Sequence, residues 1–485
     1  MENTATDKIF NLVEKNFHPY LAQKKHHVVM DFDSLDLLVY SRIDLAFKLF
    51  YLDLIEVQPD LATLVYKEHI RALSMGSYSE PGDSNKNSIE DYLKSFNKTM
   101  LSIRENGFDS NRTLIPLSNN LSIANGAHRL ASCIFYNKKV KCIVTDVDNH
   151  LYDYNFFLKR AVPRDYVELA VNKFIEYSNK THIAFLWPVA KGHTASVRNL
   201  LSNIVYEKSI KLSINGAHNL ITQIYSGEEW LGSAANGFNG AMGKVVSCFK
   251  DKSPVRMIVF TSNNLDDVNV IKDKIRELYN LGKHSIHITD NKCEALKISK
   301  LILNPNSLHF INNSRPYKYI NDYNFIIKFK KYLCDNELDP NKFLLTNDIV
   351  LSLYGIRSAF QKDCLVIDKI NHYKLDEVNF LESENNFFYN PDNYFWFADM
   401  KFLSFNNLLI SKQKFKSSKN NKDLNKMMSY ADKNFNRKII INYKQSISYF
   451  VVRLKSLLIK ILLFIGLYNK LRLIRNFLLN IKLKE

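Results

Sequence analysis

The 485-residue chain has little glycine, proline or cysteine, and its cysteines never occur as a C-x-x-C pair. Zinc sites and the disulfide frameworks of small secreted domains depend on closely or regularly spaced cysteines. The scattered cysteines therefore argue against both, and they favour a reducing cytoplasm. The segment Met1 to Asp7 has neither a basic region nor an apolar core, so we expect no signal peptide there. The six cysteines are Cys133, Cys142, Cys248, Cys293, Cys334 and Cys364.

Acidic residues are scarce relative to basic ones, because 49 Asp and Glu stand against 66 Lys and Arg and leave a net charge of +17. This balance suits nucleic acid, anionic lipid or phosphorylated substrates, and it does not choose between them. The hydrophobic content of 46% is ample for packed globular domains. Because 485 residues exceed what one core can hold, we expect several domains of the α/β (α+β) class.

Helical and strand patterns divide the chain into four predicted units. These are α/β units at 1–182 and 183–317, an α+β unit at 318–443, and a basic amphipathic segment at 444–485. Helices are expected near 42–52, 89–103, 265–281 and 323–334, and strands near 114–117, 140–144, 204–212, 255–260 and 285–288. A polar loop at 75–84, rich in Gly, Pro and Ser, is long enough to serve as a binding loop.

The most informative motif is the segment 121–134, which predicts a strand, a tight Asn125-Gly126 turn and a helix that opens on His128 and Arg129. The first turn of a helix has unpaired backbone N–H groups and partial positive charge. A histidine and an arginine at that position favour a phosphate or another anion. The alternative is an ordinary strand–helix turn in which Asn125 caps the helix and the two basic side chains are solvated.

The pattern strand–N/D-G-x-H-R–helix resembles the ParB/sulfiredoxin-like nucleotide-binding fold over residues 103–144. The resemblance implies that Asn125, Gly126, His128 and Arg129 bind the phosphates of a nucleotide. Sulfiredoxins carry their catalytic cysteine where this chain has Ala127, so their reductase chemistry is excluded. ParB proteins read DNA through a following helix-turn-helix, and the sequence after 144 shows no such pattern.

The third unit contains a second resemblance. The run from Thr346 to Arg357, then Asp363 and a late Tyr-Phe-x-Phe-x-x-x-Lys-Phe, resembles the nucleotidyltransferases of bacterial surface-glycan clusters. Those enzymes hold Mg²⁺ and a nucleoside triphosphate with a G-S turn and a D-x-D strand, because two close carboxylates are needed for the metals. Here Thr346-Asn347 stands at the turn, and Asp363 is the one carboxylate on the strand. We therefore expect a degenerate copy, with Asp363 as a metal and catalytic candidate and Asp368 or Asp399 as further carboxylates.

The second unit contains a partial repeat of the first motif, in which helix, turn, strand, turn and helix follow each other over 271–298. Glu294 stands where the first motif has Arg129, so a true repeat would have lost its anion site, and chance recurrence is the alternative. His287 and His309 are expected on strands, either as ordinary core residues or as part of a metal site. Glu228, Glu229 and Trp230 suit a hydroxyl-rich ligand such as a sugar.

The last segment, 444–485, alternates apolar residues with bases. Its apolar runs are too short to span a bilayer. An amphipathic helix lying in an anionic membrane surface is expected, and a helical hairpin packed on the body is the alternative. The bases at its edges are Lys455, Lys460, Lys470, Arg472 and Arg475.

These features predict a cytoplasmic transferase, peripheral on the inner face of the plasma membrane, in bacterial capsule or lipooligosaccharide biosynthesis. It would transfer a phosphoryl, nucleotidyl or glycosyl group from ATP, CTP or a nucleotide-sugar, with Mg²⁺ as a candidate cofactor, to a glycan or lipid-linked glycan. Asp44 and Glu80 are further candidates for the catalytic base, because they lie in segments expected near the motif. The alternative is a non-catalytic nucleic-acid-binding or ParB-like CTP-switch protein. The aromatic residues do not interleave with Lys and Arg as nucleic-acid reading would require.

Overall fold

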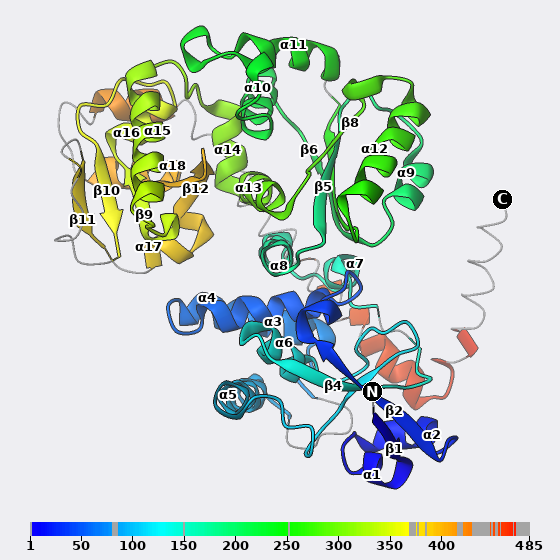
Figure 1. Ribbon diagram of the computed structural model, residues 1–485. Helices are drawn as coiled ribbons and strands as arrows, with labels where there is room; N and C mark the ends of the chain where they lie inside the picture. Colours follow the sequence, from blue (N-terminus) through cyan, green and yellow to red (C-terminus); the bar gives the residue numbers. More distant parts are fainter. Residues whose placement is uncertain are drawn as a thin grey trace.

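The computed structural model describes residues 2–79, 86–148, 151–250, 253–367, 375, 378–383, 386–414, 421–428, 447, 450–451, 454–455, 457–468 and 470–471. Over these residues the protein is a mixed α/β chain with three separate sheets, two of four strands and one of five (Figure 1). The expected multi-domain α/β class is confirmed at this level. The family identity of each unit stays a prediction.

The first sheet has the strand order β1-β2-β4-β3, in which β3 is parallel to β4 and the other pairs are antiparallel. Its strands are β1 (Glu2–Ala5), β2 (His26–Asp33), β3 (Ile115–Leu117) and β4 (Lys139–Val144). The helices of this unit are α1 (Thr6–Phe10), α2 (His18–Leu21), α3 (Ile43–Leu54), α4 (Pro59–Leu73), α5 (Ile89–Asn106), α6 (Ala127–Phe135) and α7 (Tyr154–Lys159).

Helix α3 is the centre of this unit, and every one of its residues except Asp53 is buried. It packs against α4 and α6, and on another side against α8 (Arg164–Tyr177). A helix that is buried on several sides is expected to be apolar throughout. The charged residues on α3 therefore need partners inside the protein.

The second sheet has the order β6-β7-β5-β8, and all neighbouring strands are antiparallel. Its strands are β5 (Thr181–Leu186), β6 (Ile204–Ile210), β7 (Val255–Thr261) and β8 (Ile286–Ile288). Its helices are α9 (Thr194–Leu200), α10 (Ile214–Ile224), α11 (Asn239–Cys248), α12 (Leu265–Tyr279), α13 (Lys292–Ile302) and α14 (Pro305–Asn313). Helix α8 also packs on α13, so it lies between the first two units (Figure 1).

The strand expected at His309 is wrong, because His309 lies in helix α14. The side chain of Asn304 caps this helix by accepting a hydrogen bond from the backbone N–H of Ser307 at 2.9 Å. Pro305 follows at the first helical position, where its fixed φ favours a helix start. These two residues are the sequence signal that the strand prediction overlooked.

The repeat in the second unit preserves the order of elements but not their pairing. Strand β8 is antiparallel to its neighbour β5, whereas β3 is parallel to β4. Glu294 accepts a hydrogen bond from the backbone N–H of Asp290 at 2.8 Å and contacts His287 Nε2 at 3.0 Å. At the position equivalent to Arg129, the Glu294 carboxylate therefore accepts a hydrogen bond from the turn that follows β8.

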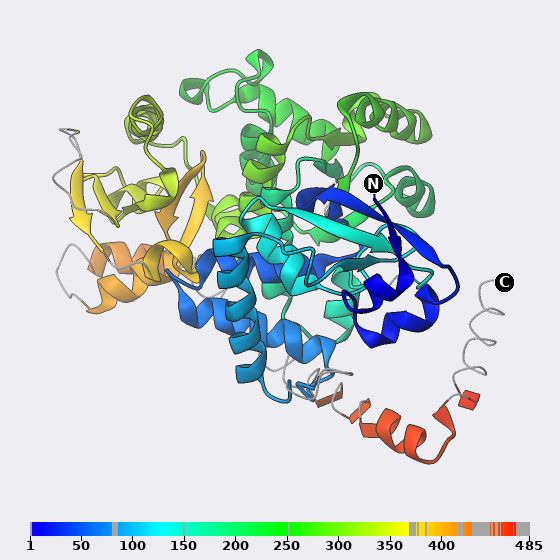
Figure 2. The ribbon, with the colours of Figure 1, turned by 60° about the horizontal axis from the view of Figure 1, so that its bottom comes forward.

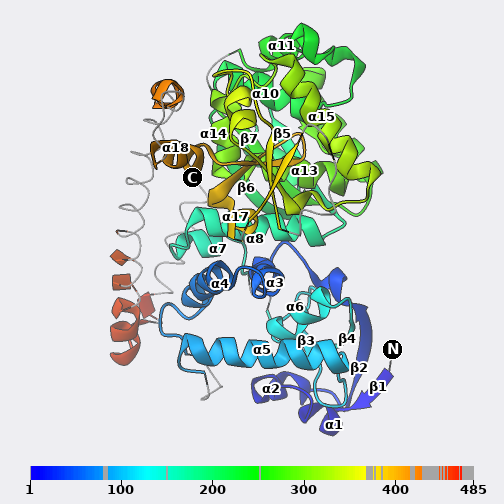
Figure 3. The same cartoon turned by 90° about the vertical axis from the view of Figure 1, so that its left-hand side faces the viewer.

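The third sheet has the order β11-β10-β9-β13-β12, with parallel pairs β10–β11 and β9–β13. Its strands are β9 (Phe343–Thr346), β10 (Asp363–Val366), β11 (Asn379–Glu382), β12 (Tyr394–Phe397) and β13 (Met400–Leu403). Its helices are α15 (Ile320–Asp335), α16 (Asp348–Leu353), α17 (Asn386–Tyr389) and α18 (Phe405–Lys414). In Figure 3 the first unit forms the lower half of the view, and the other two units overlap in the upper half.

In the part of the chain that the structure describes, no helix is long and apolar enough to cross a membrane. The described portion of 447–471 instead exposes large apolar side chains, among them Leu457, Leu463 and Phe464, of which Phe464 is 92% exposed. This segment lies apart from the sheets in Figure 2. Arg472 and Arg475 of the predicted amphipathic helix lie outside the described residues.

Candidate functional site

The segment before α6 is not the strand that the sequence predicted. Between 121 and 124 the structure has only an isolated bridge, in which Ile123 is opposite Leu117. The chain turns back sharply, because Leu121 has a φ of +62° and the Ser118 N–H donates to the Ser122 carbonyl at 2.8 Å. This tight return positions the Asn125-Gly126 turn directly after β3.

Helix α6 begins at Ala127, as the motif predicted, and its first turn has no capping side chain and no acidic residue. Gly126 precedes it with a φ of +85°, which favours glycine. Asn125 Oδ1 accepts a hydrogen bond from the Gly126 N–H at 2.5 Å and does not reach the helix. Among the described residues, no acceptor is found for the backbone N–H groups of Ala127, His128 and Arg129. This end of α6 is therefore suited to an anion.

Arg129 is tied to the protein rather than directed at open solvent. Its Nη2 lies 2.7 Å from Glu14 Oε1, and its Nη1 donates to Thr113 Oγ1. The guanidinium also lies against Gly126, where a Cβ would be 3.0 Å from Nη2. A phosphate that bound this side chain would have to displace the Glu14 carboxylate. In the structure, Arg129 instead packs against Gly126 and helps to hold the Asn125-Gly126 turn in place.

His128 contacts the first-unit core through Tyr66 of α4, whose hydroxyl lies 2.7 Å from His128 Nε2. Burial, and then the positive charges of Lys48 and Lys86, hold the pKa of His128 well below 6.5. The imidazole is therefore neutral near pH 7. Of these two lysines, Lys48 is paired with Asp44, whose negative charge acts on the imidazole in the opposite direction.

Asp44, a candidate base, lies in a buried charge cluster on α3. Arg42 binds it with two parallel contacts, Nε to Oδ1 at 2.8 Å and Nη2 to Oδ2 at 2.9 Å, and Lys48 Nζ lies 3.2 Å from Oδ2. Burial alone would raise the pKa of Asp44, but Arg42 and Lys48 overcome it and hold that pKa far below its usual value. Asp44 is thus ionised, and both of its oxygens are engaged.

Arg42 joins this cluster to the motif, because its guanidinium also donates to the carbonyl oxygen of Ile123, just before the Asn125-Gly126 turn. Lys48 Nζ extends the cluster to His69 Nε2 at 3.3 Å. His69 is fully buried and stacks on Phe47 at 5.2 Å between ring centroids. Burial, and then Lys48, keep the pKa of His69 well below 6.5.

The structure therefore brings Asp44, Asn125, Gly126, His128 and Arg129 into one region of the first unit. Sequence reasoning missed the other members of this region, which are Arg42, Lys48, Tyr66 and His69. A signal for Lys48 was present, since it stands four residues after Asp44 in a helix whose one other charged residue is Asp53. Glu80 lies outside the described residues.

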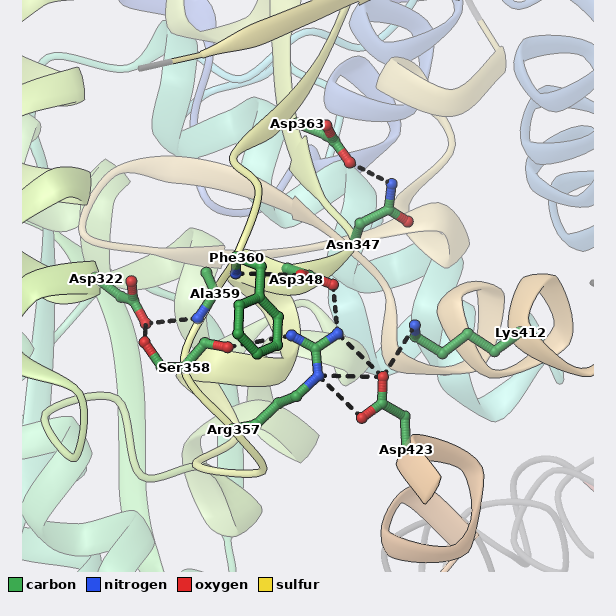
Figure 4. A network of polar contacts seen from close by, with 10 residues as sticks. All are labelled: Asp322, Asn347, Asp348, Arg357, Ser358, Ala359, Phe360, Asp363, Lys412 and Asp423. Atoms are coloured by element: carbon green, nitrogen blue, oxygen red, sulfur yellow. Dashed lines mark hydrogen bonds and ion pairs between the residues drawn. The ribbon is translucent and has the colours of Figure 1, made fainter. Parts of the chain in front are cut away.

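The third-unit candidate, Asp363, is buried at the start of β10, opposite Thr346 of β9 (Figure 4). Its Oδ2 accepts a hydrogen bond from Asn347 Nδ2 at 2.7 Å, and its Oδ1 accepts one from Asn379 Nδ2 at 3.2 Å. Asn347 forms the turn between β9 and α16 with a φ of +53°. Asn347 stands where the serine of a G-S turn was expected, and its side-chain amide donates to the Asp363 carboxylate.

A second network in this unit surrounds Arg357 (Figure 4). Its Nη2 lies 2.5 Å from Asp348 Oδ1, its Nε lies 3.0 Å from Asp423 Oδ1, and Lys412 Nζ lies 3.2 Å from the other oxygen of Asp423. Burial would lower the pKa of Arg357, but the two carboxylates raise it above its usual value. Arg357 and Lys412 together therefore balance the charges of Asp348 and Asp423.

The remaining carboxylate candidates of this unit do not join Asp363. Asp399 pairs with Lys330 Nζ at 2.5 Å and Lys297 Nζ at 3.6 Å, and Asp368 lies outside the described residues. Over the described part of the chain, no group of three or more His, Cys, Asp or Glu side chains is arranged to hold a metal ion.

The two candidate regions thus differ in what they offer a ligand. The first unit has helix amides without an acceptor among the described residues, whereas the carboxylates around Asp363 and Arg357 already have partners within the protein. Likeness to other proteins does not decide between them, since no family model, curated protein or solved structure matches the chain.

Proposed function

We propose that the chain is a nucleotide-dependent transferase whose donor phosphates bind at the first turn of α6. The observation that carries the proposal is the set of backbone amides in the first turn of α6, which have no acceptor among the described residues and no acidic side chain in that turn. A phosphate accepts hydrogen bonds from such amides and is stabilised by the helix dipole. The same features would stabilise charge that develops on a transferred phosphoryl group.

His128 would act as a neutral hydrogen-bond donor to this phosphate. When the Tyr66 hydroxyl donates to Nε2, the proton of the imidazole is on Nδ1 and is available to a phosphate oxygen. A neutral imidazole suits this role at pH 7, because it adds a donor without changing protonation when the ligand arrives.

Asp44, Arg42 and Lys48 would act as positioning residues behind the phosphate. Asp44 has both oxygens engaged and a depressed pKa, so it is poorly suited to take a proton from a substrate. Through Arg42 it instead fixes the carbonyl of Ile123 and with it the start of the turn. This assigns to Asp44 a different role from the catalytic base that the sequence suggested.

The acceptor in this proposal is a glycan or lipid-linked glycan of a bacterial surface polysaccharide, at the inner face of the plasma membrane. The exposed apolar side chains of 457–471 support attachment to a lipid surface, together with the exposed Lys460 and Lys470. The third unit would be a degenerate nucleotidyltransferase-like domain, and the engaged carboxylates of Asp363, Asp348 and Asp423 support that reading.

The test introduces a competing charge at the site and compares it with a neutral side chain of the same size. Ala127→Glu places a carboxylate in the first turn of α6, where acidic residues favour a helix, and Ala127→Gln is its neutral, equally large control. ATP, CTP and UDP-glucose are titrated against each protein by calorimetry. We expect at least one to bind, and the Glu variant to bind it at least tenfold more weakly than the Gln variant. Absence of binding, or equal affinity of the two variants, would overturn the proposal, and DNA retention at physiological salt would favour a nucleic-acid-binding protein.

A further inference from the structure

We propose that a pocket between the second and third units binds an uncharged or amino-bearing saccharide. The pocket has a volume of about 500 Å³, which is in the range of small-molecule sites. It lies between the end of α10, the following segment 226–238 and helix α15. Saccharide binding in this pocket does not depend on the nucleotide site. The further idea that the bound saccharide is the acceptor of the transfer rests on the proposed function.

The walls of the pocket are held in place by an aromatic cluster. Phe238 lies 4.7 Å from Tyr317 and 6.3 Å from Tyr323 between ring centroids. The Tyr317 hydroxyl in turn contacts Thr222 Oγ1 at 2.6 Å, which ties the cluster to α10. Of these rings, Phe238 and Tyr323 line the pocket, and aromatic rings suit the C–H surfaces of a sugar ring.

The segment that closes the pocket is built by unusual backbone conformations. Gly227 has a φ of +99°, and Phe238 has a φ of +54° immediately before α11. A left-handed conformation is uncommon for a bulky residue and is energetically unfavourable. The surrounding contacts therefore impose the position of the Phe238 ring at the wall of the pocket.

Thr222 lines the pocket and is hydrogen-bonded to Tyr317, but most of the other polar side chains of the lining have no partner among the described residues. Within the described part of the chain, the side chains of Glu228, Glu229, Ser226 and Asn324 and the hydroxyl of Tyr323 make no hydrogen bond or ion pair. Two carboxylates and an amide are strong acceptors for hydroxyl protons. Most of these side chains are exposed, so a hydroxyl-rich ligand would take the place of water at them.

The charge of the pocket excludes anionic ligands. None of the described lining residues is Lys, Arg or His, although the chain as a whole has a net charge of +17. Glu228 and Glu229 would repel a phosphate, a nucleotide or a uronic acid, and they would attract the ammonium of an amino sugar. The pocket thus has the opposite preference to the first turn of α6, which separates the ligands of the two sites.

The experiment uses the full chain and ligand-observed saturation-transfer NMR with glucose, galactose, N-acetylglucosamine and galactosamine, and with glucuronate as the anionic comparison. We expect at least one of the first four to bind, and glucuronate not to bind. Asn324→Ala and the double variant Glu228→Gln/Glu229→Gln should each weaken that binding at least fivefold. Glu277→Gln, an exposed substitution on α12 away from the pocket, should leave it unchanged.

Binding of none of the four sugars, equal binding by the variants, or equal binding of glucuronate would each overturn the inference. Binding of oligolysine with no binding of any sugar would assign the pocket to a basic peptide instead. The Ala127→Glu variant distinguishes failure of this inference from failure of the proposed function. Its substitution lies in the first unit and should not change saccharide binding. Loss of nucleotide binding with retained sugar binding would leave this inference standing.

Discussion

The guanidinium of Arg42 donates to the carbonyl oxygen of Ile123, and this single contact joins the buried charges of α3 to the turn that precedes α6. Arg42 holds Asp44 with its other nitrogen atoms, so one side chain connects a carboxylate to a backbone segment. The geometry of the proposed phosphate site therefore depends on charges that lie behind it. The predictions below follow from this dependence and from the networks of the other units.

Asp44→Asn removes the negative partner of Arg42 and Lys48 while it keeps the shape of the side chain. Both cations would then be buried without a counter-charge, which costs about 3–5 kcal/mol in the free energy of unfolding. Urea denaturation followed by far-ultraviolet circular dichroism measures the loss. Asp36→Asn is the control, because the Asp36–Lys180 pair is exposed at 3.1 Å and should be worth less than about 1 kcal/mol. A similar small loss for both variants would contradict the buried role of Asp44.

The histidines of the first unit predict a pH dependence of stability. The pKa values of His69 and His128 lie well below 6.5 in the folded protein, so the unfolded chain takes up protons first as the pH falls. Stability should therefore be complete above about pH 6.5 and should decrease below it. Urea denaturation at pH 7.5, 6.0 and 5.0 measures the slope, and His128→Gln should reduce it. An unchanged slope in that variant would mean that His128 is not held neutral.

The ion network around Arg357 is expected to stabilise the third unit alone. Arg357→Met leaves Asp348 and Asp423 unbalanced, whereas Arg357→Lys keeps the charge but loses the forked geometry. Hydrogen–deuterium exchange of peptides covering 343–366 should be faster by more than tenfold in the Met variant and by less in the Lys variant. Peptides of the first unit should be unaffected. Equal exchange in all three proteins would show that this ion network does not stabilise α16.

The exposed apolar segment near the C-terminus predicts membrane binding. Leu457→Glu combined with Phe464→Glu should abolish flotation of the full chain with vesicles that contain anionic lipid. Val246→Glu, which changes a 67% exposed side chain on α11, should leave flotation unchanged. The wild-type protein should float less with zwitterionic vesicles, since the lysines of the segment contribute to binding. Flotation of the double variant at the wild-type level would refute the membrane role.

The turn before α6 could be predicted from the sequence, because an Asn-Gly pair followed by an amphipathic helix is a local signal. It failed at 121–124, where the tertiary contact of Ile123 with Arg42 and the return at Leu121 replace a strand. Tyr66 and His69 were missed for the same reason, since only packing brings α4 against α3 and α6. His309 is different, because the Asn304-Pro305 start of α14 was present in the sequence and was overlooked.

The nucleotide titration of Ala127→Glu against Ala127→Gln tests the central claim most directly. Both variants add the same volume at the first turn of α6, so their difference in affinity reports only the charge at the proposed phosphate position. We predict that ATP, CTP or UDP-glucose binds the Gln variant at least tenfold more tightly than the Glu variant, with both proteins equally folded. Equal affinities would contradict the claim that the first turn of α6 binds the phosphates of a nucleotide.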